Sequence, residues 1–449
     1  MAAVVIELTA LTAVAAEEVA PPSLVQQNAL SVVGSNPQLA SLRELVVLVM
    51  ANQPELKQAE AESRMADGRL KEARSARLPQ FAVNGGYGYE HQKSGSRPVI
   101  IYDNQYQVQF KITQPVLDEG IEANVRRVAA TSMASDWQLV GVREQLMLRT
   151  IELLAEVVRQ QQLTDIARDN LKLHRSYVAQ MKDIARSDVG RASDLPMAQA
   201  RVALAESMLT SRLARLEAAR VQWRTHSSMA VPDQESFGQG FQSLVTGLEW
   251  APMPPDLDSA LAEASKNSPQ LQKALSEVKA AEHNQTLAKS ATKPKVNFDY
   301  QRRMGDNFGS VLGSQDDWSI GVNLQWALPV NPGFTYAQRA ALEAQRVAEA
   351  GVDATGLKIR SAVETQWYEL LANQATHTSY LNYVNSADQV VKAYAEQFKI
   401  GRRSLLDVLN AENELFTARS NTLNAQTDTA LAAWRLLSLR GVMALALGI

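Results

Sequence analysis

Hydrophobic and polar residues alternate along two short parts of the chain, one near residue 110 and the other near residue 322. The first series is Tyr106, Val108, Phe110 and Ile112, and the second is Ile320, Val322, Leu324 and Trp326. A period of two residues is typical of a β-strand with one apolar face. Each series follows another strand-like segment and a polar loop. The pattern therefore predicts two β-hairpins, with strands at about 79–91, 103–114, 294–304 and 317–328.

The four predicted strands are each about ten residues long, and nearly half of the aromatic residues lie in or around them. Strands of that length, with one apolar face and aromatic residues near their ends, are typical of a transmembrane β-barrel. Two hairpins packed in the core of a soluble protein are the alternative. We favour the barrel because no other part of the sequence predicts strands that would complete a soluble sheet.

Much of the remaining chain follows a helical pattern. Apolar residues recur in steps of seven, at Val202, Leu209, Leu216 and Trp223, and again at Leu409, Phe416 and Leu423. This spacing is typical of helices that pack side by side as coiled coils. We predict long helices at about 119–188, 194–226, 333–399 and 404–438. At 1.5 Å per residue, the longer ones would reach roughly 100 Å.

The two halves of the chain are copies of one unit. Residues 52–62 align with 267–277, and Pro79 with Pro294, both at an offset of 215 residues. Landmarks that keep their order over most of the chain predict two tandem repeats of about 200 residues. The predicted organisation is a signal-peptide remnant at 1–16, an N-terminal extension at 17–37, repeat 1 at 38–228, a linker at 229–255, repeat 2 at 256–440 and a C-terminal tail at 441–449.

One turn occurs in both repeats. It reads DVGRASDLPMAQARVAL at 188–204 and KIGRRSLLDVLNAENEL at 399–415. Gly190 and Gly401 fit the left-handed residue that ends a helix. Ser193 and Ser404 fit the cap of the helix that follows. The pattern predicts a helical tip in each repeat, at the end of the long helices far from the hairpins.

The second tip carries two adjacent cations, Arg402 and Arg403, immediately before a predicted helix. The N-terminus of a helix repels positive charge. We therefore expect acidic partners close by, and Asp188 and Asp194 of the first tip are the candidates.

Composition narrows the functional classes. A formal net charge of −3, without a basic tract, gives no reason to expect a nucleic-acid partner. The chain has no cysteine, which excludes disulfides, thiolate ligands and cysteine nucleophiles. No two of its histidines lie within four residues of each other, and no Walker motif or nucleophile elbow occurs. We predict no metal site, no cofactor and no catalytic residue, which favours a conduit or scaffold over an enzyme.

The first residues, MAAVVIELTALTAVAAEE, are mostly small and apolar, and Ala13, Val14 and Ala15 resemble a signal cleavage site. Glu7 interrupts the run and no basic residue precedes it, so we interpret the segment as a shortened or mis-started signal. An ordinary N-terminus is the alternative. The rest of the sequence contains no run of 18 apolar residues, so it predicts no transmembrane helix.

Two tandem copies with a short helix, a strand pair and long helices turning at a Gly…Ser tip resemble the TolC family of outer-membrane exit ducts. The resemblance covers about residues 38–440, and its most specific part is GRRSLLDVLNAENEL. It implies a homotrimer in a Gram-negative outer membrane, in contact with its lipid, without enzyme activity. It also implies a mixed α/β membrane fold. Each chain would give four strands to a shared twelve-stranded barrel, continuous with a periplasmic α-helical barrel.

The resemblance also implies partners, namely a periplasmic adaptor protein and an inner-membrane ABC or RND transporter. In the family, the second tip carries the tunnel entrance, with an arginine that tethers the closed state and acidic residues at the constriction. The matching positions here are Gly401, Arg403, Asp407 and Asn410. The resemblance thus implies Arg403 as the tether and Asp407 as an entrance carboxylate, while Asn410 departs from the acidic type. Asp194 would replace the tether's usual acidic partner, because Pro196 stands at that position.

A plainer interpretation of the same residues stays open. Asp407 lies three residues after Ser404, where an acidic residue stabilises the start of a helix. The pair Arg402 and Arg403 could be solvated charge.

Two export routes remain open for such a duct. One is type I secretion of an unfolded polypeptide, and the other is a multidrug efflux pump. The missing cysteine favours secretion, since the resemblance implies that many drug-efflux ducts are lipid-anchored. A soluble coiled-coil scaffold is the alternative from a different class, and it would explain the long helices but not the hairpins.

Overall fold

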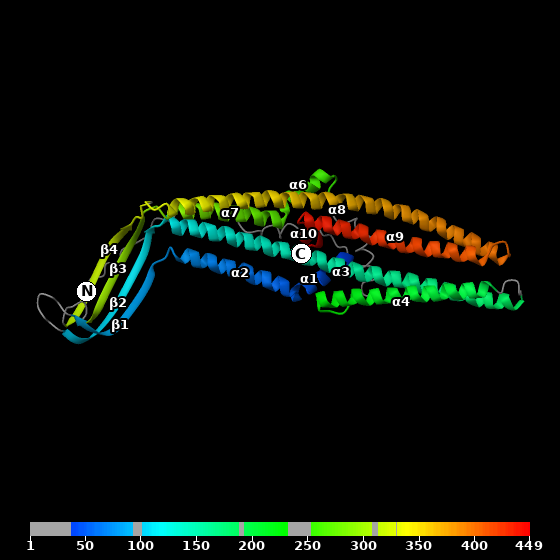
Figure 1. Ribbon diagram of the computed structural model, residues 1–449, viewed down its shortest axis with the longest axis horizontal. Coiled ribbons are helices and arrows are strands. Elements are labelled where there is room, and N and C mark those ends of the chain that lie inside the picture. The colour runs from blue at the N-terminus through cyan, green and yellow to red at the C-terminus, as the bar shows by residue number, and fades with distance from the viewer. Residues whose placement is uncertain (1–36, 93–100, 188–192, 232–252, 308–312, 329) are drawn as a thin grey trace.

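A four-stranded sheet forms one end of the elongated molecule, and long helices extend from it to two tips at the other end (Figure 1). The computed structural model describes residues 37–92, 101–187, 193–231, 253–307, 313–328 and 330–449. The elements are α1 (Pro37–Asn52), α2 (Pro54–Ser75), β1 (Gln80–Gln92), β2 (Ile101–Leu117), α3 (Glu119–Ser187), α4 (Asp194–Ser227), α6 (Leu257–Asn267), α7 (Pro269–Ser290), β3 (Lys295–Asp306), β4 (Ser314–Gln325), α8 (Gly333–Lys399), α9 (Leu405–Leu439) and α10 (Met443–Leu447). The predicted signal remnant, Asp188, Gly190 and most of the predicted linker lie outside the described residues.

The two halves repeat the same order of elements, namely two helices, two strands and two long helices. Pro54 and Pro269 each occupy the first turn of a helix, where a missing N–H costs nothing, so each proline starts a new helix after a short one. The four long helices begin and end within about two residues of the ranges that the sequence predicts. Their length follows from the scarcity of proline and glycine between the hairpins and the tips.

All four strands form one antiparallel sheet in the order β1-β2-β3-β4. The central pair joins the repeats, because Ile112 of β2 lies opposite Tyr300 of β3. Figure 1 shows that the helices leave the sheet from one end and do not lie over a face. The alternative of two hairpins packed in a soluble core is therefore wrong for this chain. The sheet keeps two free edges, at β1 and β4.

The two faces of the sheet differ in chemistry. One face, here called the apolar face, carries Phe81, Val83, Tyr87, Tyr106, Val108, Phe110, Ile112, Val296, Phe298, Tyr300, Trp318, Ile320, Val322 and Leu324. Towards the end of the sheet far from the helices, this face also carries Arg302 and Asp316, which pair with each other at 2.7 Å. The other, here called the polar face, carries Asn84, Gln107, Gln109, Lys111, Thr113, Asn297, Asp299, Gln301, Arg303, Gln315, Asp317, Ser319, Asn323 and Gln325. Such a division is the pattern of a strand with lipid on one side and water on the other.

The predicted bounds of the last strand are wrong by about three residues. The strand β4 begins at Ser314 and ends at Gln325, so Trp326 lies just outside it. The indole N–H of Trp326 instead donates to the carbonyl of Thr292 at 3.1 Å. The alternating pattern continues past the last ladder position, which is why periodicity alone placed Trp326 in the strand.

The long helices pair as two coiled coils, α3 with α4 and α8 with α9, and α3 also lies against α9. Within the seven-residue series, Leu216, Trp223 and Leu409 are buried, so that spacing marks helix faces that pack. Closer to the sheet, α2, α3, α7 and α8 lie side by side in that order (Figure 1). Both coiled coils therefore run from the middle of the molecule to its tips.

A compact core lies midway along the molecule, where the C-terminus ends (Figure 1). Trp223 of α4 and Trp434 of α9 are buried there, against α1 and α10. Residues 441–449, the predicted C-terminal tail, include the short helix α10, whose Met443 is fully buried. Gly441 makes the turn into this segment with a φ of +66°. A helix of five residues has no periodicity that a sequence pattern could reveal.

A buried carboxyl joins this core to α3. Glu144 is 5% exposed, and its Oε1 accepts from the backbone N–H of Ala444 at 3.4 Å. Its Oε2 has no hydrogen-bond partner among the described residues. Burial raises the pKa of Glu144 from 4.5 to about 7, and the backbone N–H groups of Ala444 and Met443 lower it only in part. The protonated form is therefore the one that the folded core prefers.

Glu144→Gln should remove a pH dependence of stability. Because the folded pKa lies above the unfolded one, the contribution of Glu144 is fully present below pH 4.5 and is lost as pH rises towards 7. We expect the variant to be more stable than the parent at pH 8 by roughly 3 kcal/mol, and nearly equal at pH 4.5. Thermal unfolding at both pH values measures this. Glu343→Gln, at an exposed ion pair, is the control and should shift neither curve. An equal loss of stability for Glu144→Gln at both pH values would contradict the assignment.

Candidate functional site

The tip of the second repeat is a tight turn between α8 and α9. Gly401 has a φ of +74°, which a residue with a side chain rarely adopts. The N–H of Gly401 donates to the carbonyl of Phe398 at 3.0 Å, and that of Arg402 donates to Gln397 at 2.9 Å. These bonds satisfy the last carbonyls of α8. The turn therefore has the left-handed glycine that the sequence predicts at this position.

Ser404 caps α9 and forms two hydrogen bonds with Asp407. The Ser404 hydroxyl accepts from the backbone N–H of Asp407 at 3.2 Å and donates to the Asp407 carboxylate at 2.9 Å. Asp407 thus occupies the capping position, next to the positive end of the helix. Its carboxylate is only half-buried, so a negative charge also remains at the surface of the tip. The capping role and an entrance role are compatible.

The first tip is built differently. Ser193 has helical dihedral angles, φ −67° and ψ −21°, and its side chain makes no capping hydrogen bond. Ser193 therefore stands at the predicted N-cap position of α4 but gives no side-chain cap, because a capping hydroxyl needs an extended backbone to reach the N–H groups of the first turn. Asp194 is the first residue of α4 and is half-buried.

The side chain of Arg403 contacts residues of its own repeat, the second. Its Nε donates to Gln397 Oε1 at 3.1 Å, and its guanidinium carbon lies 4.1 Å from the centre of the Tyr394 ring. Within the described part of the chain, its carboxylate contact is Asp407, at 3.8 Å. Within one chain, the predicted pairing of Arg403 with Asp194 is therefore not made, because closer partners hold the guanidinium. Arg402 has an exposed side chain.

Two other side-chain bonds join the second tip to the first repeat. Arg201 of α4 donates to Asn410 Oδ1 of α9 at 3.0 Å. Deeper in the molecule, the Tyr177 hydroxyl of α3 donates to Glu412 Oε1 of α9 at 3.1 Å. We call these two bonds the tip bonds. They rest on an apolar cluster that contains Met181, Ala198, Phe398, Leu405, Val408 and Leu409.

Burial shifts the pKa values of both partners in the bond between Tyr177 and Glu412. It raises the pKa of Glu412, against the lowering effect of the Tyr177 hydroxyl and Arg419. Burial, together with the nearby Glu412, also raises the pKa of Tyr177, so the phenol stays protonated and can donate. One turn before, burial and the charge of Arg201 lower the pKa of His174, which therefore adds no charge at neutral pH. Removing the Tyr177 hydroxyl would therefore be costly, because it would take a hydrogen-bond donor away from the buried Glu412 carboxylate.

Further side-chain contacts between α3 and α9 lie nearer the middle of the molecule. Arg159 of α3 contacts Asp428 of α9 at 2.7 Å, and Glu152 of α3 contacts Arg435 of α9 at 2.8 Å. These contacts join two full charges, and the middle core lies beside them. Among the described residues, the tip bonds thus differ from these pairs, because only one partner of each tip bond carries a full charge.

Sequence reasoning missed Tyr177, Arg201 and Glu412. The available signal was Glu412, which lies in the apolar stripe of α9 between Val408 and Leu415. An acidic residue in a buried stripe needs a partner on the helix packed against it. The partner could not be named, because pairing across 235 residues depends on how α3 packs on α9.

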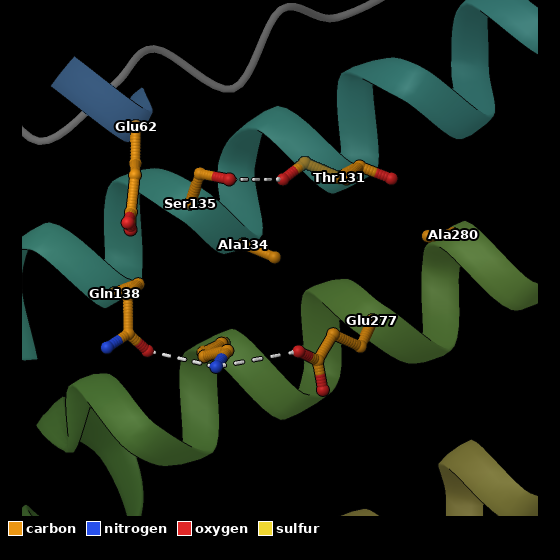
Figure 2. Close-up of a pocket in the computed structure, with 8 residues that line it drawn as sticks. Glu62, Thr131, Ala134, Ser135, Gln138, Glu277 and Ala280 are labelled. Atoms are coloured by element: carbon orange, nitrogen blue, oxygen red, sulfur yellow. Dashed lines mark hydrogen bonds and ion pairs between the residues drawn. The ribbon is translucent and has the colours of Figure 1, made fainter. Parts of the chain in front are cut away.

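A groove lies where α2, α3 and α7 meet (Figure 2). It has a volume of about 280 Å³ and a floor of small residues that includes Ala134 and Ala280. Lys273 of α7 donates to Gln138 of α3 at 2.9 Å, and Glu277, one turn further along α7, lies 3.8 Å from Lys273 and offsets its charge. This arrangement offers a polar recess rather than a pair of groups poised for acid–base chemistry.

No group of three or more histidine or acidic side chains is placed to hold a metal ion in the part of the chain that the structure describes. No helix among the described residues is both long and apolar enough to cross a membrane.

The chain matches the model of a protein family described as outer membrane efflux protein, over residues 45–224 and 260–442. It is 25% identical to the outer membrane efflux protein BepC of Brucella suis biovar 1, over 90% of this chain and 86% of that protein. It is 24% identical to the outer membrane protein TolC of Vibrio cholerae, over 88% and 89% of the two chains. It is 20% identical to the proteases secretion protein PrtF of Dickeya chrysanthemi, over 90% and 93%.

The fold is similar to that of solved outer-membrane channels. The structure of VceC from Vibrio cholerae superposes with a TM-score of 0.75 at 16% identity, over 90% of this chain and 96% of that one. Coverage of nine-tenths of this chain at that TM-score shows that the overall fold is shared.

Proposed function

Because the chain belongs to the outer membrane efflux protein family, we propose that it is the exit duct of a type I secretion system and passes an unfolded polypeptide across the outer membrane. The family consists of homotrimeric ducts without enzyme activity, which work with a periplasmic adaptor and an inner-membrane transporter. Three chains with four strands each close one barrel in the outer membrane, and their helices form a tunnel across the periplasm. A coiled-coil scaffold is excluded, because the matched family residues include the strands.

The polar face of the sheet is the observation that carries the secretion proposal. In a closed barrel, the apolar face contacts lipid and the polar face lines the lumen. Lys111 lies 3.9 Å from Asp299, and Arg303 lies directly opposite Asp317, so the opposite charges balance. A lumen of amides and balanced charges suits a cargo whose side chains change from residue to residue. The similarity to PrtF, whose name states protease secretion, supports the same route.

Multidrug efflux is the second candidate. It is favoured by the similarity to BepC, which is named an outer membrane efflux protein. An amide-lined lumen also admits small molecules, and one duct can serve more than one transporter. An ABC transporter is the expected partner for secretion, and an RND transporter is the expected partner for drug efflux.

We place the entrance at the second tip, with Asp407 as its carboxylate and the tip bonds as the contacts that keep it closed. Three chains would bring three Asp407 carboxylates to one constriction, where they concentrate cations. Opening would move α8 and α9 away from the first repeat. The tip bonds would then break before the charged pairs near the middle, because they involve less charge. Any contact of Arg403 or Asn410 with a neighbouring chain would add to this closure.

Deleting the gene tests the export route. We expect the set of secreted proteins to lose at least one polypeptide, with little change in susceptibility to drugs. Comparing culture supernatants by mass spectrometry and growth inhibition by a drug panel measures both. Complementation with the parent gene is the control. Loss of drug resistance with an unchanged set of secreted proteins would overturn the secretion proposal in favour of efflux.

Removing both tip bonds should open the resting channel. Each bond to a charged partner contributes about 1.5–3 kcal/mol, so Tyr177→Phe combined with Arg201→Gln should raise the open fraction roughly tenfold or more. Single-channel conductance in planar bilayers measures this. Arg175→Gln is a matched control, because Arg175 of α3 bonds Glu206 of α4 inside the first repeat. If the double variant conducts like the parent while Arg403→Gln opens the channel, closure depends on contacts between chains.

Asp407→Asn separates the entrance role from the capping role. Asparagine keeps an oxygen that can accept from Ser404 but removes the negative charge. We expect block by hexaamminecobalt(III), added at the tip side in planar bilayers, to weaken about tenfold. Ser404→Ala breaks the cap without removing the charge and should leave the block intact. The entrance assignment fails if Asp407→Asn is blocked as strongly as the parent.

A further inference from the structure

The helix α1 is apolar on more faces than its own chain covers. Leu45, Val46 and Val49 are buried in the middle core. Val47 and Leu48 lie between them in the sequence and are exposed, and Leu48 is 51% accessible. We call this exposed pair the α1 face. A helix that is apolar all round is normally buried on all sides. The α1 face therefore indicates a partner outside the chain.

A groove lies between α6 and α8 and is here called the waist groove. It has a volume of about 420 Å³, and its apolar lining includes Leu261 of α6, Leu271 of α7 and Ile359 of α8. Beside it on α8, Leu357 is 68% exposed. Apolar side chains around an open groove gain free energy when another apolar surface covers them. The waist groove is thus a second apolar surface that one chain leaves open.

Gly356 keeps the waist groove wide. It lies inside α8 and lines the groove, although glycine destabilises a helix interior. Its φ is not positive, and a Cβ added to it would meet nothing within 4 Å. Neither the backbone nor the packing of its own chain therefore requires glycine. The missing side chain leaves room for a group that comes from outside the chain.

The α1 face and the waist groove lie at similar distances from the sheet. At 1.5 Å per residue, α2 spans about 33 Å between the sheet and the end of α1. On the same scale, Gly356 lies about 35 Å along α8 from its start beside the sheet. A helix that follows α2 and a groove on α8 can therefore meet at one level of the molecule.

The two surfaces lie on opposite sides of the layer of helices. The helix α1 packs on α3 and α4, whereas α6 packs mainly on α8. Figure 1 shows α6 beyond α8, on the side away from α2 and α4. Closing the barrel joins β1 of one chain to β4 of the next. Because α2 leads into β1 and α8 follows β4, the same closure brings the α1 face of one chain towards the waist groove of the next.

We propose that the waist groove binds the α1 face of the neighbouring chain, and that three such contacts hold the trimer at its middle while the tips open. The partner is a second copy of this chain, because the contact continues the interface that the sheet edges begin. The contact depends on trimer assembly and not on the export route. Only its role during opening rests on the gating proposed above. An apolar contact at the waist uses none of the charged groups at the tips, so it can persist when the tip bonds break.

Introduced cysteines test the contact, because the chain has no cysteine of its own. One variant combines Leu48→Cys with Leu357→Cys, and a second combines Val47→Cys with Ala262→Cys. Outer-membrane vesicles are treated with a short bis-maleimide and analysed on denaturing gels. We expect covalent dimers and trimers from each pair, and monomers from each single variant. Leu48→Cys with Leu381→Cys is the control and should stay monomeric, because Leu381 lies about 36 Å further along α8 than Leu357. The proposal is wrong if neither pair links chains.

Filling the groove should weaken the trimer. Gly356→Leu places a side chain in the waist groove without touching its own chain, so we expect the trimer to dissociate several degrees below the parent on gels of unboiled, stepwise-heated samples. Gly351→Leu is the matched control. An added Cβ there also meets nothing within 4 Å, but five residues along a helix place it on a different face of α8. An equal shift in both variants, or no shift in Gly356→Leu, would contradict the contact.

The linked trimer tests the role of the waist in opening. The cysteine pair at Leu48 and Leu357 is combined with Tyr177→Phe and Arg201→Gln, and conductance in planar bilayers is measured before and after linking. We expect the open fraction to be the same in both states. If linking closes the channel again, the waist moves during opening and a fixed waist is wrong. If the channel stays closed even without the link, the gating assigned to the tip bonds is wrong, and the cross-links still decide whether the waist contact exists.

Discussion

The free edges of β1 and β4 impose the constraint on which the rest of the structure depends. Inside a membrane, a backbone N–H or C=O group without a partner costs several kcal/mol, and no water is available to satisfy it. The sheet of one chain has two such edges and an apolar face that no helix covers. One chain therefore cannot occupy the membrane alone. Three chains satisfy every edge at once, and the threefold arrangement then extends into the helices.

The helices have a different role, which is to continue the barrel as a tunnel. Each repeat supplies one coiled coil, and α3 lies against α9 as the seam between them. The side-chain contacts along this seam differ between the middle of the molecule and the tip. Near the middle, buried tryptophans and charged pairs such as Glu152–Arg435 hold the repeats together. Towards the tip, the side-chain bonds between the repeats that the described residues make include Tyr177–Glu412 and Arg201–Asn410. A contact that weakens towards one end permits motion at that end while the other stays fixed.

The two ends of the duct also differ in how they treat a cargo. Near the tip, Asp407 presents a carboxylate beside a helix N-terminus, which gives a local electrostatic preference. In the sheet, Lys111 and Asp299 offset each other, Arg303 lies opposite Asp317, and amide and hydroxyl side chains make up much of the remaining polar face. A charged entrance followed by a wall of balanced charges and amides would let one protein serve cargoes that share little sequence. The adaptor and the transporter would then supply the remaining specificity.

The four strands, the long helices and the capped turn at Gly401 and Ser404 could be predicted from the sequence, because each depends on neighbours within a few residues. The tandem repeat could be predicted because its landmarks recur in the same order. What those elements contact followed only from how the chain folds. The tertiary structure turned Arg403 towards Tyr394, gave Ser193 a helical backbone without a cap, and folded the last residues into α10. It also paired Tyr177 with Glu412, across 235 residues. A local pattern records which side chains are apolar and which bonds the backbone lacks. Which distant helix supplies the partner is fixed only when α3 packs against α9.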